Sequence, residues 1–200
     1  EERELTQLIA DEVDRISNLI ERIDVFAELG PSPDQSVNIH EALARARKVL
    51  DSSGALKDLN FNEAFDPSLP QVRGDFEGLV QIFINLIKNA ADAARDGGKE
   101  ITIKTAYRHG IRLAVDGRRE WGALPIEVAV QDNGPGIPQD LQSNIFDPFV
   151  TTKSGGHGLG LAVVAKIVSD HGGAVEFESE PFRTVFSVHL PFFYQSEKMK

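Results

Sequence analysis

The chain contains no cysteine among its 200 residues. This excludes a disulfide framework and any metal site built on cysteine, and it fits the cytoplasmic location that we expect. No apolar run approaches the ~18 consecutive residues that a membrane-spanning helix needs. We therefore expect no membrane segment in this chain.

Basic residues are also in short supply. Lys and Arg number 21 against 31 Asp and Glu, so the net charge is −10. Such a chain repels a phosphate backbone, and we expect no nucleic-acid partner. The first residues, Glu1 to Glu4, do not form a signal peptide, and the absence of an initial Met leads us to expect a fragment of a longer protein.

Residues 1–29 contain neither Gly nor Pro, and their apolar residues follow a heptad pattern. Ile recurs every seven residues, and other large apolar residues fall at the complementary position; these residues are Ile9, Ile16 and Ile23, then Leu5, Leu19 and Phe26. The pattern predicts a bundle or coiled-coil helix, or alternatively a lone amphipathic helix packed on its own domain. Residues 30–37 follow as a linker, because Gly30, Pro31 and Pro33 break the helix.

Residues 38–193 form one predicted domain, and residues 194–200 form a tail. Helical periodicity appears over Val37–Leu50 and Asp75–Ala94, with Asp75 as the N-cap and Gly97-Gly98 as the end of the second helix. Strand patterns, a polar insert over 108–124 and a later helix complete the domain; the strands are at 101–106, 126–130, 174–178 and 184–190, and the helix is at 161–168. This order predicts an α/β fold, a two-layer sandwich in which helices cover one face of a mixed sheet.

Two glycine clusters border the predicted strand at 126–130 and the helix at 161–168. The first, Asp132–Ile137, follows the strand, and the second, Gly156–Leu161, opens the helix. A strand-end Asp can accept a hydrogen bond from an exocyclic amine, although it can also bind its own backbone in a turn. Glycines let the backbone approach a ring or a phosphate, and a helix N-terminus attracts an anion.

The helix at 75–94 carries two asparagines, Asn85 and Asn89, at a spacing that places both on one face. Their neutral oxygens suit Mg²⁺, which prefers oxygen ligands. Lys88 and Asp92 are close neighbours, and Lys88 is either a phosphate contact or a solvated side chain. Together with the glycine clusters, this helix predicts a site for adenine, phosphates and Mg²⁺.

These segments resemble the N box and the two glycine boxes of the histidine-kinase ATP-binding domain, and Ile145–Phe149 is similar to its F box. The ordered set spans Val37 to Phe193 and is far more specific than a single GxG. The resemblance implies that Asn85 and Asn89 are catalytic, that Asn89 binds Mg²⁺ and that Thr184 supports the adenine. It further implies an ATP site made of Asn85, Lys88, Asn89, Asp92, Asp132, Gly134, Gly136, Ile137, Phe149, Thr152, Lys153, Gly156, His157, Gly158, Leu159, Gly160 and Thr184.

The residue type at position 85 distinguishes ATP hydrolysis from phosphate transfer among the proteins that this chain resembles. Similar hydrolases, such as type II topoisomerases, carry a Glu four residues before the metal-binding Asn, where it activates water as a general base. Asn85 cannot take a proton near neutral pH, so the resemblance implies transfer of the γ-phosphate to an external nucleophile. A hydrolase of the same fold and a non-catalytic nucleotide-binding scaffold remain as alternatives.

The histidine that this family phosphorylates is not evident. Only His40-Glu41 begins the expected motif, and Ala44 and Arg45 stand where Asn and Pro are expected. We therefore expect the phosphoacceptor upstream of Glu1, with residues 1–29 forming the second helix of a dimerisation hairpin in a homodimer.

Three segments indicate a subfamily. Phe146–Lys153, Lys166–Gly173 and Arg183-Thr184 resemble the NtrB-type nitrogen-regulation sensor kinases, although Arg183 stands where the wider family usually has Gly. The resemblance implies an NtrC-type response regulator as partner and a PII-type signal protein as a further one.

Overall fold

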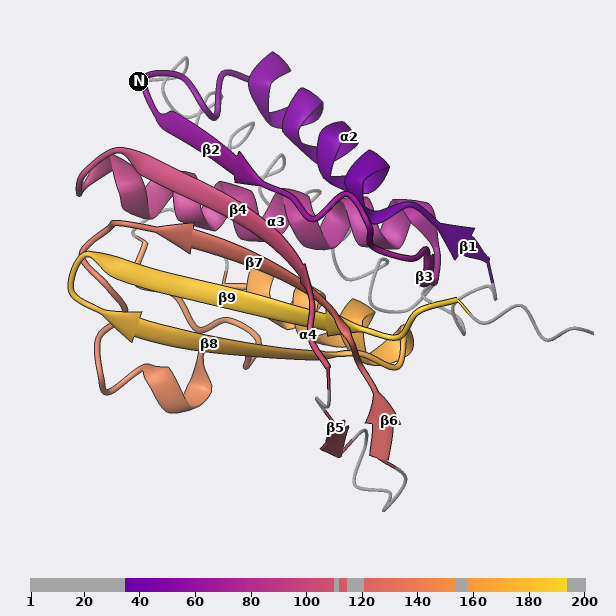
Figure 1. Cartoon of the computed structure of the whole chain (residues 1–200). Coiled ribbons are helices and arrows are strands. Elements are labelled where there is room, and N and C mark those ends of the chain that lie inside the picture. The colour runs from indigo at the N-terminus through magenta and orange to yellow at the C-terminus, as the bar shows by residue number, and fades with distance from the viewer. Residues whose placement is uncertain (1–34, 110–111, 115–120, 154–157, 194–200) are drawn as a thin grey trace, which may run out of the picture.

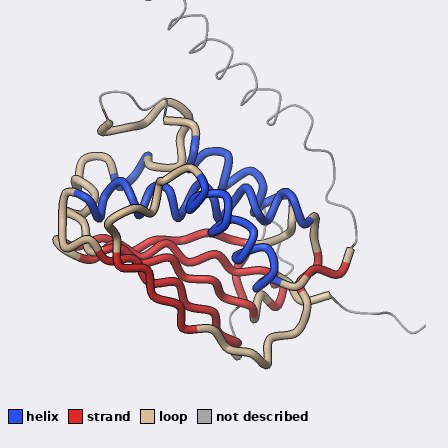
Figure 2. The backbone as a smooth tube through the Cα atoms, turned by 90° about the horizontal axis from the view of Figure 1, so that it is seen from above, coloured by secondary structure: helices blue, strands red, loops and turns tan. Residues whose placement is uncertain are grey.

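The computed structural model describes residues 35–109, 112–114, 121–153 and 158–193 of the chain. In this part of the chain, three helices lie together on one face of a five-stranded sheet (Figures 1 and 2). The predicted two-layer α/β sandwich is therefore confirmed. The predicted helix over residues 1–29 and the tail at 194–200 lie outside the described residues.

The sheet has the strand order β2-β4-β7-β9-β8. These strands are β2 (Asn60–Ala64), β4 (Glu100–Tyr107), β7 (Ile126–Asp132), β9 (Arg183–Leu190) and β8 (Ala174–Glu180). β2 runs parallel to β4 and all other neighbours are antiparallel, so the sheet is mixed. The register places Asp132 opposite Thr184 and Thr184 opposite Ser179, which brings three polar residues to one end of the sheet.

The first described helix, α2 (Ile39–Ser52), begins two residues later than the sequence predicts. Val37 instead belongs to a short strand, β1 (Ser36–Val37), which pairs with β3 (Val72–Arg73). The reason is the cap: the Asn38 side chain accepts a hydrogen bond from the amide of His40 and so starts the helix there.

Helix α3 (Phe76–Arg95) is the central helix of the layer. Asp75 caps it as predicted, because its carboxylate accepts a hydrogen bond from the Gly78 amide at 2.6 Å. The predicted role of Gly97 and Gly98 in ending the helix is wrong, since the left-handed residue after the helix is Lys99, with φ 60°. The two glycines instead leave room for the turn at Asn133, whose atoms would lie 2.4 and 2.2 Å from their added Cβ atoms.

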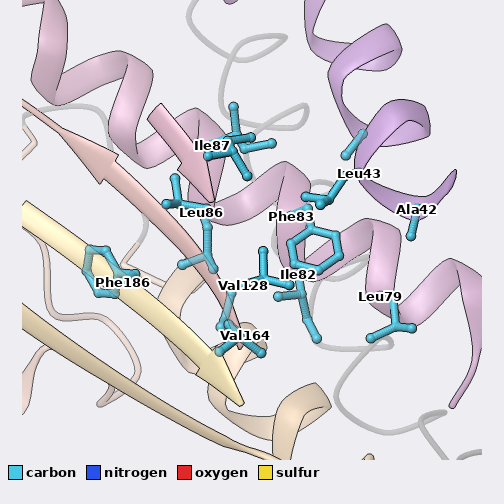
Figure 3. Close-up of a cluster of buried hydrophobic side chains, with 14 of the residues drawn as sticks. Ala42, Leu43, Leu79, Ile82, Phe83, Leu86, Ile87, Val128, Val164 and Phe186 are labelled. Atoms are coloured by element: carbon cyan, nitrogen blue, oxygen red, sulfur yellow. The ribbon is translucent and has the colours of Figure 1, made fainter. Parts of the chain in front are cut away.

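One face of α3 is buried in the core (Figure 3). Leu79, Phe83 and Leu86 are fully buried there, and Val128 of β7 and Val164 of α4 (Gly160–Asp170) join them from the sheet and the next helix. Each such side chain contributes about 1.5–3 kcal/mol by leaving water. This packing fixes the rotation of α3, so the polar residues between its apolar positions must face outward.

The structure also contains a short hairpin and a 3₁₀ helix. β5 (Arg112–Ala114) and β6 (Trp121–Ala123) pair antiparallel, which confirms a hairpin within the predicted insert. A 3₁₀ helix, Gln142–Asn144, lies between β7 and α4. No helix in the described ranges has the length and apolar character to span a membrane.

Candidate functional site

A cavity of about 860 Å³ opens between α3, the loop after β7, the start of α4 and the end of β9. Its volume is within the range of small-molecule sites. Its lining combines polar groups from α3 with apolar side chains from the surrounding loops and from β9. The lining residues that bear on the argument are Ile84, Asn85, Lys88, Asn89, Asp92, Asp132, Gly136, Ile137, Leu141, Ile145, Thr151, Thr152, Lys153, Gly158, Leu159, Gly160, Val163, Thr184 and Phe186.

The predicted polar face of α3 lines one side of this cavity. Asn85, Lys88, Asn89 and Asp92 follow the spacing i, i+3, i+4, i+7, which puts them along one stripe of the helix. Asn85 Oδ1 and Asn89 Nδ2 both lie 3.8 Å from the point where a Cβ on Gly160 would stand. The two asparagines therefore meet the N-terminal end of α4, where free amides favour an anion.

Asp132 lies at the other end of the cavity and is only 3 % exposed. Burial raises the pKa of its carboxyl group to about 6, although the Gly134 amide and the nearby Lys153 charge act in the opposite direction. The Gly134 amide donates to Asp132 Oδ1 at 2.9 Å, so the turn interaction considered above is present. The other carboxylate oxygen has no hydrogen-bond partner among the described residues, which leaves it for a donor in the cavity.

Thr184 is 3 % exposed and lies beside Asp132 on the neighbouring strand. Its hydroxyl is 3.0 Å from Ser179 Oγ, which accepts a hydrogen bond from the Ile137 amide at 2.8 Å. Sequence reasoning missed Ser179, although its position opposite Thr184 in a hairpin is a signal that could have found it. The Arg183 side chain extends to Glu178 on the surface, which explains why a large residue is tolerated beside Thr184.

The first glycine cluster has two different functions. Gly136 lines the cavity at φ +88°, a conformation that favours glycine. Gly134 does not line it: an added Cβ would lie 2.7 Å from the carbonyl oxygen of Ala93 in α3. The small size of Gly134 therefore allows the loop to pack against the helix, and its contact with a ligand stays a prediction.

Lys153 reaches the α3 stripe from the segment before the second glycine cluster. Its Nζ lies 2.7 Å from Asp92 Oδ2 and 3.3 Å from Asn89 Oδ1. The ammonium group of Lys153 thus lies beside Asn89, the predicted metal ligand, and beside Asp92. No group of three or more His, Cys, Asp or Glu suited to a metal occurs in the described residues, so any metal here needs amide oxygens and ligand atoms.

The rest of the second glycine cluster is partly described. Gly158 has φ +65° and lines the cavity together with Leu159 and Gly160. Gly156 and His157 lie outside the described residues. Phe149 does not line the cavity and its side chain is 66 % exposed, so the structure does not support its predicted contact with the ligand.

Apolar residues that the sequence analysis did not assign also line the cavity. They are Ile84, Leu141, Ile145, Val163 and Phe186. The helical and strand periodicities mark several of them as buried, but nothing local distinguishes a cavity wall from the core.

His40 lies away from this cavity. Its Nε2 is 3.0 Å from Thr105 Oγ1, its ring stacks on Phe65 at 5.0 Å, and burial lowers its pKa. These contacts explain His40 as a packed residue of α2, in agreement with its rejection as a phosphoacceptor.

Comparison with known proteins finds relatives that match this chain over nearly its whole length. The sensory histidine kinase/phosphatase NtrB of Azospirillum brasilense is 54% identical over 196 residues, which are 98% of this chain and 49% of that protein. The chain therefore spans about half the length of this relative.

Two solved structures show the same architecture. Full-length ShkA in complex with AMPPNP matches with a TM-score of 0.72 and 26% identity, over 98% of this chain and 40% of that chain. A nucleotide-free catalytic domain of histidine kinase ThkA matches with a TM-score of 0.62 and 29% identity, over 78% of this chain and 94% of that one.

A family model described as histidine kinase-, DNA gyrase B- and HSP90-like ATPase matches residues 74–193. That range contains α3, both glycine clusters, Asp132 and Thr184, which together form the cavity. The chain belongs to this ATPase family, and membership implies that it binds ATP.

Proposed function

We propose that this chain is the ATP-binding catalytic part of a sensor histidine kinase of nitrogen regulation. It donates the γ-phosphate of ATP to a histidine, from which the phosphate passes to an aspartate of a response regulator. The observation that carries the proposal is the polar stripe of α3, where Asn85 stands four residues before Asn89 and both line the cavity. The similarity to NtrB supports the nitrogen-regulation assignment.

Adenine binding is assigned to the sheet end of the cavity. The free oxygen of Asp132 accepts a hydrogen bond from the adenine amino group, and Thr184 supports the ring directly or through a water. Ile137 and Phe186 supply apolar surface on either side. The phosphates then extend toward Gly158, Gly160 and the N-terminal end of α4.

Mg²⁺ is assigned to the α3 stripe. Asn89 Oδ1 is its protein ligand, and Asn85 supports the phosphates or the metal. The ammonium group of Lys153 beside Asn89 supports a cation at this position. When bound, the metal offsets negative charge on the phosphates.

Asn85 decides between transfer and hydrolysis. Its side-chain amide has no basicity near neutral pH, so it does not accept a proton from water. No other carboxylate occupies this position on the described stripe, because Asp92 lies nearly two turns further along α3 and pairs with Lys153 and Arg95. The helix therefore orients phosphates for an external nucleophile.

The accepting histidine is proposed to lie in a segment outside residues 1–200. No histidine among the described residues lines the cavity, and the NtrB relative is about twice as long as this chain. Residues 1–29 are proposed to pair with that segment in a homodimer. An NtrC-type response regulator, a PII-type signal protein and a cytoplasmic location, where ATP is available, complete the proposal.

The test is a phosphotransfer assay with labelled ATP. The chain alone should form no phosphohistidine and release little phosphate, whereas a separately produced histidine-bearing segment of the NtrB relative should become labelled.

Asp132→Asn serves as the control with weakened nucleotide binding, and Asn85→Glu should increase phosphate release by restoring a general base. Steady phosphate release by the unaltered chain would identify a hydrolase, and nucleotide binding with neither transfer nor release would identify a non-catalytic nucleotide-binding scaffold. Failure to bind any nucleotide would contradict the ATP site itself. Label on His40 would contradict the assignment of the phosphoacceptor.

A further inference from the structure

Lys153 holds a cationic group at the position assigned to the metal. Its Nζ lies 2.7 Å from Asp92 Oδ2 and 3.3 Å from Asn89 Oδ1. An ammonium ion and a hydrated divalent cation both seek oxygen atoms and negative charge. Because both groups are positively charged, they repel each other and compete for the same oxygens.

Asp92 is held in place independently of Lys153. Its Oδ1 accepts from Arg95 Nη1 at 3.0 Å, and Arg95 Nη2 donates to the carbonyl oxygen of Ala55 at 2.5 Å. Removal of the lysine ammonium therefore leaves a carboxylate oxygen that is already oriented toward Asn89. Arg95 remains as a partner of this carboxylate when Lys153 leaves.

The lysine contact is also weak enough to exchange. The side chains of Lys153 and Asp92 are 42% and 32% exposed, and exposed ion pairs contribute about 0.2–1 kcal/mol. A phosphate-bound divalent cation carries twice the charge and displaces such a contact without a large energetic cost.

We propose that Lys153 is a cation placeholder: its ammonium occupies the metal position beside Asn89 and Asp92 until metal-bound nucleotide enters and displaces it. This inference rests on the proposed function, because it concerns the metal position of that same site. Its consequence is that the nucleotide-free protein disfavours free divalent cations, so that metal enters with the nucleotide and not before it.

The test measures Mn²⁺ binding without nucleotide, by electron paramagnetic resonance of the free ion, at millimolar metal. Lys153→Met should bind Mn²⁺ more tightly than the unaltered protein, by up to about fivefold, the upper end expected for loss of an exposed ion pair. Adding Asn89→Ala to Lys153→Met should abolish that gain.

The matched control is Lys104→Met. Lys104 is exposed on β4, makes no ion pair among the described residues, and its loss changes the net charge equally. It should leave Mn²⁺ binding unchanged. Equal Mn²⁺ binding by the unaltered protein and Lys153→Met, including no binding by either, would overturn the inference, as would the same gain in Lys104→Met.

Failure of the proposed function gives a different result. ATP titrated into the unaltered protein with Mg²⁺ should show binding. If it does not, the ATP site is wrong; if it does and Lys153→Met gains no affinity for Mn²⁺, only the placeholder is wrong.

Discussion

The two ends of the cavity are held together in different ways. The end at Asp132 is fixed by short backbone and side-chain hydrogen bonds, among them Gly134 N to Asp132 at 2.9 Å and Ile137 N to Ser179 at 2.8 Å. The end at Asn89 is held by the partly exposed ion pair of Lys153 with Asp92. The end proposed to bind the base is therefore held by more hydrogen bonds than the end proposed to bind the phosphates.

Gly134 and Gly160 differ in how closely their surroundings pack, although Gly158 is packed as tightly against the backbone of Phe149 as Gly134 is against α3. A Cβ added to Gly134 would lie 2.7 Å from backbone atoms of α3, and one added to Gly160 would meet only side-chain atoms at 3.8 Å. The first distance is a clash with backbone and the second is ordinary contact. A well-packed end suits the adenine in the proposed site, since that part of ATP does not react.

The largest expected effect is on folding stability. Gly134→Ala should lower the free energy of unfolding by about 2–3 kcal/mol, because the loop or α3 must shift. Gly160→Ala, at the start of α4, should change it by no more than about 1 kcal/mol, since Ala favours a helix over Gly. Urea unfolding of both variants tests the comparison, and equal losses would show that the two ends are equally rigid.

Asp132→Asn should weaken ADP binding by about 1.5–3 kcal/mol, the usual contribution of a hydrogen bond to a charged group. Isothermal titration calorimetry measures the change. Folding should not suffer, because the substitution removes a buried carboxylate whose pKa is raised to about 6. Unchanged ADP affinity would place the adenine elsewhere.

Asn89→Ala should affect the other end selectively. Loss of a metal ligand should reduce the gain in ATP affinity that Mg²⁺ provides by at least about tenfold, while adenosine binding stays close to that of the unaltered protein. Titrations with ATP, with and without Mg²⁺, measure the gain in affinity from the metal, and a titration with adenosine measures binding of the base and ribose. An equal loss for adenosine would mean that the two ends are not independent.

The smallest effect is a pH dependence from Asp132. Its pKa is raised from 3.8 to about 6 in the folded protein, so the folded state binds this proton more tightly than the unfolded chain. Stability of the nucleotide-free protein should therefore fall as pH rises from about 4 through 6, by about 1 kcal/mol between pH 5 and 7.5.

Adenosine affinity should change in the opposite direction, rising with pH through 6 as the acceptor ionises. Asn at position 132 should remove both trends. Their persistence in that variant would assign them to another group.

The sequence predicted the α3 stripe and Asp132 because each depends on local pattern. The helical period places Asn85 and Asn89 together, and a strand followed by Asn-Gly places Asp132 at a turn. The use of Gly134 for packing was not predictable, because it depends on how closely the loop approaches Ala93. The contact of Lys153 with Asp92 joins residues 61 positions apart and likewise depends on the tertiary arrangement.

The most direct test of the account is a crystal structure of this chain with Mg²⁺ and a non-hydrolysable ATP analogue. The account predicts the adenine amino group within hydrogen-bond distance of Asp132, the metal beside Asn89 Oδ1, and Lys153 Nζ no longer in contact with Asp92. A nucleotide bound outside this cavity, or bound with its phosphates at Asp132, would contradict it.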